Sequence, residues 1–160
     1  MISRRLASLA LGAVIVLGAS GCSMVSPQAT TIPYSASDGV NVPASGPLLV
    51  RNAMVIATED GSTGNLIGAI VNDTDDAQTL NVGVAGKVAT VQVPARTTVS
   101  LGVDGAEPLR IDSLGTTPGH YLDVAFQSGD GEGVEIAVPV LDGTLPQYAE
   151  FVPAVLEPAA

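Results

Sequence analysis

The alternation of apolar runs and turn residues is the feature that most constrains the fold of this chain. From residue 48 onward, short runs rich in Val, Leu and Ile are separated by clusters of Gly, Asn, Asp and Pro. This pattern is typical of short strands joined by tight turns. No segment repeats apolar residues at the helical period over a useful length. The expected strands are residues 48–58, 66–72, 79–84, 87–93, 97–103, 109–111, 120–127 and 134–141.

Seven to nine short strands of this kind predict an all-β fold, an antiparallel β-sandwich of the immunoglobulin-like type. Leu122, Val124 and Phe126 fall on one face of their strand, so we expect them in the core. Pro139 predicts an edge position or a bulge in the last strand. The Cys-Trp-Cys hallmark of immunoglobulin domains is missing, because the chain has one cysteine and no tryptophan. The type of sandwich therefore stays open on this ground.

Residues 1–21 have the organisation of a bacterial lipoprotein signal peptide. Arg4 and Arg5 give a positive start, and the apolar run at residues 6–17 has the length of a signal-peptide core, too short to cross a membrane. Small residues then lead to Cys22, which is the only cysteine of the chain. We expect cleavage before Cys22 and lipidation of its thiol.

The sequence Ala-Ser-Gly-Cys resembles the lipobox of bacterial lipoproteins. It departs from that motif at Ala19, where Leu is commoner. The alternatives are a plain signal peptide, or an N-terminal anchor with a chance cysteine. With lipidation, the mature protein would be extracytoplasmic, on the outer face of the cytoplasmic membrane. Because one acyl chain binds a bilayer only marginally, stable anchoring would require the multiple acylation that bacterial lipoproteins receive, palmitate included.

Beyond the signal peptide, the composition divides the chain into three parts. Residues 22–46, rich in Ser, Pro, Thr and Ala, are expected to form a flexible tether whose later part docks on the domain. Tyr34 and Val40–Val42 are candidates for a first edge strand. Residues 47–141 are the expected sandwich, and residues 142–160 a C-terminal tail that covers the domain or reaches a partner.

The charge balance excludes one large class of functions. After removal of residues 1–21 the chain keeps four basic and 16 acidic residues, a net charge of −12. Such a surface repels phosphate backbones, and no basic patch with interleaved aromatics is present, so no nucleic-acid binding is expected. Anionic lipid headgroups would be repelled as well, which leaves the lipid as the membrane contact.

Few residues could carry chemistry. His120 is the only histidine; with Met54 it is a weak candidate for binding copper, although a structural role at the start of a strand is the more ordinary one. Asp73, Asp75 and Asp76 are weak candidates for calcium, whose ligands are oxygens, as are the carboxylates of residues 129–133, but neither loop has EF-hand spacing. No serine lies on a Gly-x-Ser-x-Gly elbow and no loop is built to cradle phosphate. The sequence therefore predicts no catalytic residues, no cofactor and no enzyme.

From Leu48 onward the chain resembles the LpqE-like lipoproteins of actinobacteria. The residues that carry the resemblance are Leu49-Val50-Arg51-Asn52-Ala53, Asp60-Gly61, residues 66–72 and Val138-Pro139-Val140-Leu141. These lipoproteins are distantly similar to the periplasmic copper chaperones of the PCu(A)C type, which implies a cupredoxin-like β-sandwich. The chaperones bind Cu(I) through a cluster of His and Met, which this chain lacks. The resemblance also implies a possible partner, the actinobacterial cytochrome bc–aa3 respiratory assembly.

Two functions from different classes follow as hypotheses. The preferred one is a non-enzymatic accessory domain, lipid-anchored through Cys22, that binds a membrane protein complex through its sheet edges or acidic loops. The alternative is a protein that binds or delivers a metal, copper at His120 with Met54 or calcium at the acidic loops.

Overall fold

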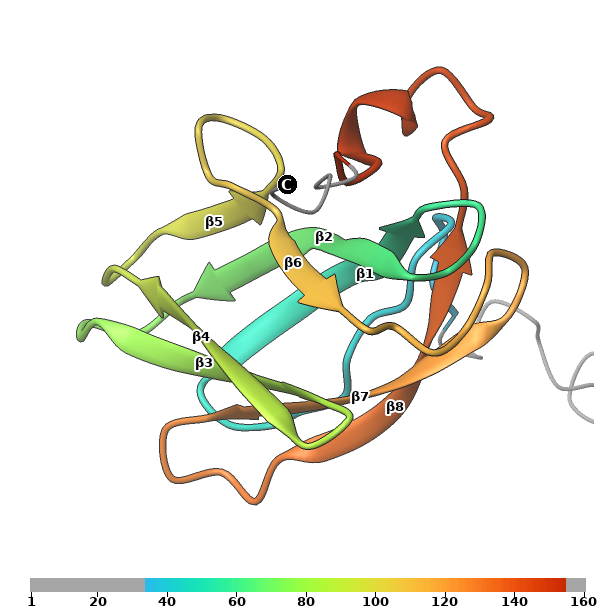
Figure 1. The fold of residues 1–160 in the computed structure, drawn as a ribbon. Helices are drawn as coiled ribbons and strands as arrows, with labels where there is room; N and C mark the ends of the chain where they lie inside the picture. The colour runs from blue at the N-terminus through green and yellow to red at the C-terminus, as the bar shows by residue number, and fades with distance from the viewer. Residues whose placement is uncertain (1–33, 155–160) are drawn as a thin grey trace, which may run out of the picture. The chain divides into compact units, whose positions relative to one another are not determined.

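The computed structural model describes residues 34–154, and Cys22 and the expected signal peptide lie outside them. Within residues 34–154, eight strands and one short 3-10 helix follow one another (Figure 1). They are β1 (Leu48–Ala57), β2 (Thr63–Asn72), β3 (Gln78–Val84), β4 (Lys87–Val93), β5 (Thr98–Leu101), β6 (Leu109–Asp112), β7 (Tyr121–Ser128), β8 (Val134–Leu141) and η2 (Ala149–Phe151).

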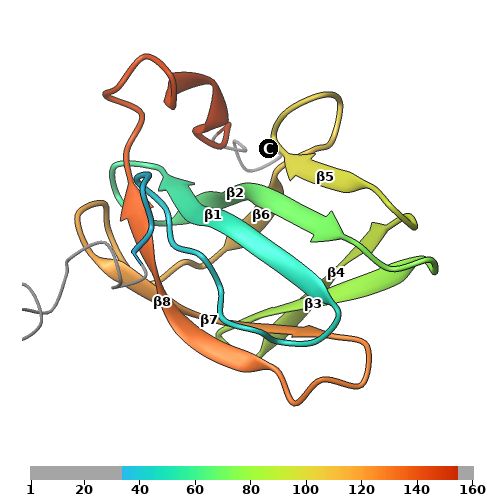
Figure 2. The same ribbon diagram turned by 180° about the vertical axis from the view of Figure 1, so that it is seen from behind.

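The strands form two packed sheets that share one seam. One sheet has the order β4-β3-β7-β8 and the other has β1 and β2, with β5 and β6 both pairing with β2. Every pairing is antiparallel except the seam between β1 and β8, where only Val55 with Val140 and Ile56 with Leu141 are paired. Seen from behind, β1 and β8 diverge away from that short seam (Figure 2). The all-β sandwich expected from the sequence is confirmed.

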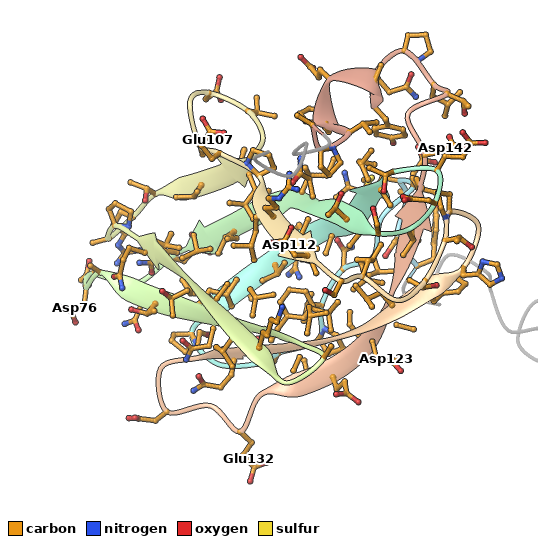
Figure 3. The ribbon with its side chains drawn as sticks, in the orientation of Figure 1. Asp76, Glu107, Asp112, Asp123, Glu132 and Asp142 are labelled. Atoms are coloured by element: carbon orange, nitrogen blue, oxygen red, sulfur yellow. The ribbon has the colours of Figure 1, made fainter. Side chains whose placement is uncertain are left out.

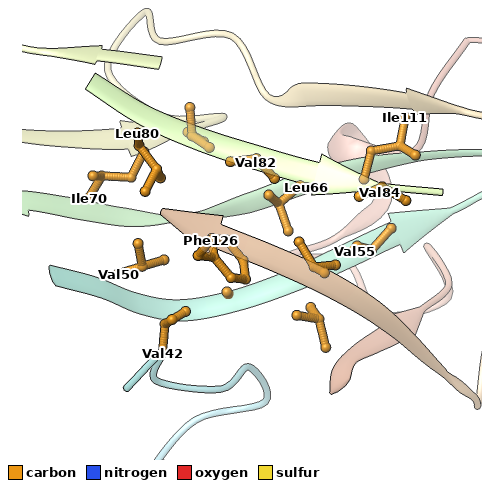
Figure 4. Packing of buried hydrophobic residues seen from close by; sticks show 14 of the residues in the cluster. Val42, Val50, Val55, Leu66, Ile70, Leu80, Val82, Val84, Ile111 and Phe126 are labelled. Carbon is orange, nitrogen blue, oxygen red and sulfur yellow. The ribbon is translucent and has the colours of Figure 1, made fainter. Parts of the chain in front are cut away.

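The core lies between the two sheets and is almost entirely aliphatic. Phe126, 1% exposed, is the only aromatic among the buried side chains of this cluster. It lies among valines and leucines of β1, β2 and β3 (Figure 4). Val124 and Phe126 are buried and Leu122 packs against the cluster as expected from their alternation, with Tyr121 and Asp123 exposed on the other face of β7.

β8 lies between β7 and β1 in the strand order, and Pro139 lies just before the pairing of β8 with β1 begins. The N–H of Val140 donates to His120 O at 3.0 Å, towards β7. Since successive backbone groups of a strand point to opposite sides, the nitrogen of Pro139 points away from β7. On that side the pairing with β1 begins only at Val140, so the missing N–H costs no ladder bond.

Two expected strands differ from what the structure shows. The strand expected at residues 97–103 is shorter, because Gly102 has φ +88°, a conformation outside the strand region, and leaves Val103 48% exposed in the turn. Val40–Val42 does not form an edge strand. Val40 makes a single bridge with Ala53, and Pro43, which has no N–H, follows directly.

Residues 38–42, in the last part of the expected tether, lie along β1. Val40 and Ala53 exchange backbone hydrogen bonds of 2.9 and 2.8 Å, and Val42 N donates to Val50 O at 3.0 Å. β1 bulges here, and Asn52, at φ +52°, accepts a bond from Gly39 N at 2.9 Å. A Cβ at Gly39 would lie 2.6 Å from the Asn52 backbone, so the close approach needs glycine.

Candidate functional site

Met54 lies on the outer face of β1, away from the main core. With Ile56 and Ile67 it forms a second buried cluster, covered by Tyr148, Phe151 and Val152. These covering residues belong to the segment 142–154, which we call the C-terminal strap. The strap is held by Asn65 Nδ2, which donates to Phe151 O at 2.9 Å, and Arg110 Nη1, which donates to Ala154 O at 3.2 Å. The thioether of Met54, in a residue 2% exposed, therefore lies in an apolar layer.

His120 lies elsewhere, exposed in the turn that leads into β7. Its Nδ1 is 3.3 Å from both Thr117 Oγ1 and Thr117 O. Its ring borders a shallow hollow of about 400 Å³ that is also lined by Asp60 and Thr117. Met54 does not line this hollow, so the structure does not bring the two copper candidates to one site.

Asp60, across the hollow from His120, is already occupied by its own turn. Its Oδ1 accepts bonds from Thr58 Oγ1 at 2.6 Å, Ser62 Oγ at 2.9 Å and Ser62 N at 3.1 Å. The bond from Thr58 and those from Ser62 hold the pKa of Asp60 below its ordinary value. The carboxylate is thus a turn-forming group in the charged state.

The loop with the calcium candidates is organised by Asn72. The side-chain amide of this buried residue lies 2.9 Å from Asp76 O and 3.0 Å from Pro94 O, and its Oδ1 accepts bonds from Thr74 N and Oγ1. Asp75 forms an exposed ion pair with Arg96 at 2.8 Å. The three aspartates of the loop do not converge, and no group of three metal-ligating side chains occurs within residues 34–154.

The other carboxylates are spread in the same way. Figure 3 shows Asp76, Glu107, Glu132 and Asp142 far apart at the ends of different loops. In the 129–133 loop, Gln127 Nε2 donates to Gly129 O and Gly131 O, so the turn is closed by an amide. The acidic residues thus form a dispersed negative surface around the domain.

The segment that precedes β1 and the C-terminal strap are joined by one hydrogen bond between side chains. Tyr148 of the strap donates a hydrogen bond to Asp38, and both line a hollow of about 430 Å³ together with Leu141, Leu145 and Asp142. The bond to Asp38, together with burial and the nearby charge of Asp38, raises the pKa of Tyr148. This contact between residues 110 apart had no signal in the sequence.

β4 is the outermost strand of its sheet (Figure 1). Between β4 and β6 the two sheets open into a cleft of about 230 Å³, lined by apolar residues such as Val82, Val84 and Ile111. Val88 is 68% exposed on the other face of β4. Seven residues of open edge, without proline or bulge, form a surface to which another strand can be added.

Solved structures with a similar architecture are known. The apo PCuAC domain from PmoF1 superposes with a TM-score of 0.51 at 18% identity, over 63% of this chain and 98% of that domain. The copper-bound PCuAC domain from PmoF2 superposes with a TM-score of 0.50 at 14% identity, over 64% of this chain and 98% of that domain. This chain shares the PCuAC fold. The cupredoxin-like sandwich is confirmed, and at these identities the likeness concerns the fold alone.

No family model matches the chain, and no curated protein matches it in sequence. None of the helices in residues 34–154 is long and apolar enough to cross a membrane.

Proposed function

We propose that this chain is a lipid-anchored, extracytoplasmic accessory protein that acts by binding a partner, not by catalysis. The observation that carries the proposal is the attachment of residues 40–42 to β1, through the paired bonds of Val40 with Ala53 and the bond of Val42 to Val50. This segment would connect the domain to an acylated Cys22. Its backbone bonds make it part of the sandwich, so a lipid on Cys22 would hold the whole domain through this segment.

The partner that we propose is a membrane protein complex, with a respiratory cytochrome assembly as the first candidate. The resemblance to LpqE-like lipoproteins of actinobacteria supports it. The net charge of −12 after residue 21 supports a lipid as the membrane contact, because anionic headgroups repel such a surface.

The test combines labelling with purification. We expect a fatty-acid probe to label the wild type and not Cys22→Ser, and the wild type purified from mild-detergent membranes to bring a membrane complex with it. Cys22→Ser, released from the membrane, is the matched control for non-specific capture. A labelled wild-type protein that is always recovered alone would contradict the proposed role while leaving the anchor intact.

Copper binding or delivery is the second candidate, and the shared fold with a copper-bound PCuAC domain favours it. Because His120 and Met54 lie apart, each is tested as a ligand by itself. If one of them binds the ion, its variant, His120→Ala or Met54→Leu, weakens Cu(I) binding in competition with a chelator. A wild-type protein that takes no Cu(I) from the chelator would remove this candidate.

Calcium at the 73–76 turn is tested in the same way. Binding there raises the melting temperature with Ca²⁺ concentration, and Asp73→Asn with Asp76→Asn abolishes the rise. An unchanged melting temperature of the wild type would remove the calcium version.

A further inference from the structure

The free edge of β4 can be defined group by group. β3 and β4 are joined by Ala85 and Gly86, both with positive φ, and Val84 faces Lys87 across this two-residue turn. In such a hairpin the facing pair next to the turn is hydrogen-bonded, and hydrogen-bonded pairs recur at every second residue. Lys87, Ala89, Val91 and Val93 therefore bond to β3, and the N–H and C=O groups of the three residues between them point outward.

Those three residues, Val88, Thr90 and Gln92, are also exposed at their side chains. Within residues 34–154, β4 pairs with β3 alone. Of the features that protect an exposed strand, this edge has only one charge, Lys87 at its start, and it has neither a proline nor a bulge. Two of its three outward residues, Val88 and Thr90, are β-branched, and this side of β4 is unpaired within the described residues.

The charges at the two ends of this edge are opposite. Lys87, at the start of β4, has no ion-pair partner in the part of the chain that the structure describes, and it shares the cleft with the ion pair of Arg110 and Asp112. Beyond the end of β4 lies the 73–76 turn, since Gln78 pairs with Val93. Arg96 neutralises Asp75 there, which leaves Asp73 and Asp76. One end is thus positive and the other negative.

We propose that this edge binds a second copy of the chain, β4 against β4, in an antiparallel arrangement about a two-fold axis at Thr90. In this register Thr90 faces Thr90 of the other copy, and Val88 faces Gln92. Each facing pair exchanges two hydrogen bonds, so every outward N–H and C=O of the edge is satisfied. The two four-stranded sheets then become one continuous sheet.

The two-fold arrangement also uses the opposite charges. Antiparallel pairing places the Lys87 end of each copy beside the Asp76 end of the other. Asp76 precedes β3 of its own copy, and that strand lies about two strand spacings (roughly 10 Å) from β4 of the other copy. This separation is within the combined reach of the two side chains. An isologous contact of this kind repeats each favourable pair twice and closes at the dimer. The net negative charge of each copy is screened over about 8 Å at physiological ionic strength, so the local pairs decide the register.

A single cysteine at the two-fold axis tests the arrangement. In the full chain, Thr90→Cys would place two thiols on facing residues with Cα atoms about 5.5 Å apart, within disulfide range. We expect mild oxidation with diamide to give a species of twice the mass. The matched control is Thr98→Cys, an exposed threonine of edge strand β5, which stays a monomer. Both are also made with Cys22→Ser, which keeps the test independent of the proposed anchor.

Charged substitutions at two exposed positions test the register without disturbing the core of the domain. Val88→Lys with Gln92→Lys places lysines opposite each other across the axis. We expect the dissociation constant of the dimer, measured by sedimentation, to rise at least tenfold. Val88→Lys with Gln92→Glu places opposite charges there and restores the dimer.

A wild-type protein that sediments as a monomer, with no Thr90→Cys crosslink in membranes, would overturn the proposal. A Thr90→Cys crosslink to a different protein would overturn it as well, and would assign the edge to a strand of that partner. Neither outcome affects the lipid anchor, which the Cys22→Ser labelling tests separately.

Discussion

The hydroxyl of Tyr148 donates a hydrogen bond to Oδ2 of Asp38 at 2.5 Å and so joins the C-terminal strap to the segment that precedes β1. Asp38 is exposed, which limits the energy of the bond. We expect Tyr148→Phe to lower the free energy of unfolding by at most about 1 kcal/mol, measured by urea denaturation. Asp38→Asn keeps an acceptor oxygen, so its free energy of unfolding should fall less than that of Tyr148→Phe. A larger loss in Asp38→Asn would contradict this assignment.

The same bond gives the protein a dependence on alkaline pH. The bond to Asp38 raises the pKa of Tyr148 above its ordinary value of 10.0. A group whose pKa is raised by folding stabilises the fold fully below the unfolded value and loses this contribution as the pH rises through the folded value. The stability difference between wild type and Tyr148→Phe should therefore hold up to about pH 10 and shrink above it. A difference that grows above pH 10 would refute the assignment.

Asn72 should be the most sensitive polar residue of the sandwich. It is 1% exposed, and its amide satisfies the carbonyls of Asp76 and Pro94. Asn72→Ala leaves buried groups without partners, so we expect a loss of about 2–3 kcal/mol in the free energy of unfolding. Asn81→Ala, which breaks a half-buried bond to Gln127, is the control and should lose clearly less. Equal losses would show that Asn72 does not organise the loop.

The sequence predicted the strands well where alternation and turn residues agree. Residues 87–93 and 134–141 form β4 and β8 with the expected bounds, because each is bordered by a glycine turn. The seam of β1 and β8 could not be predicted in this way, because it consists of two residue pairs between strands far apart in sequence. The role of Asn72 was missed for a similar reason: its side-chain N–H groups bond to backbone carbonyls, which leave no mark in the sequence.

The candidate site was less predictable than the fold. Side-chain types named His120 and Met54 as a pair, but whether they meet depends on which face of β1 Met54 occupies. The bulge at Asn52 shifts the register between Arg51 and Met54, and Met54 packs under the strap. Such a bulge reverses which residues face the core, and periodicity alone does not locate it.

Phe126 should dominate the packing energy, as the only aromatic of an aliphatic core. Phe126→Ala leaves a large cavity, for which we expect a loss of about 3–5 kcal/mol in the free energy of unfolding. Phe126→Leu keeps most of the volume and should cost less than half as much. Thermal and urea denaturation measure both. Similar losses in the two variants would show that the neighbouring valines collapse around the site.

The strap covers Met54, so we expect it to limit access of an oxidant to the thioether. The side chain of Phe151 packs on the cluster of Met54, Ile56 and Ile67. We expect Phe151→Ala to speed the oxidation of Met54 by hydrogen peroxide several-fold, followed by mass spectrometry, because the thioether becomes accessible before the sandwich unfolds. Leu145→Ala is the control, since this strap residue is 49% exposed and lies outside the cluster. Equal rates in both variants and the wild type would mean that oxidation requires opening of the whole domain. Copper binding through Met54 would then require the same opening. A faster rate in Phe151→Ala alone would instead show that the strap limits access to that thioether.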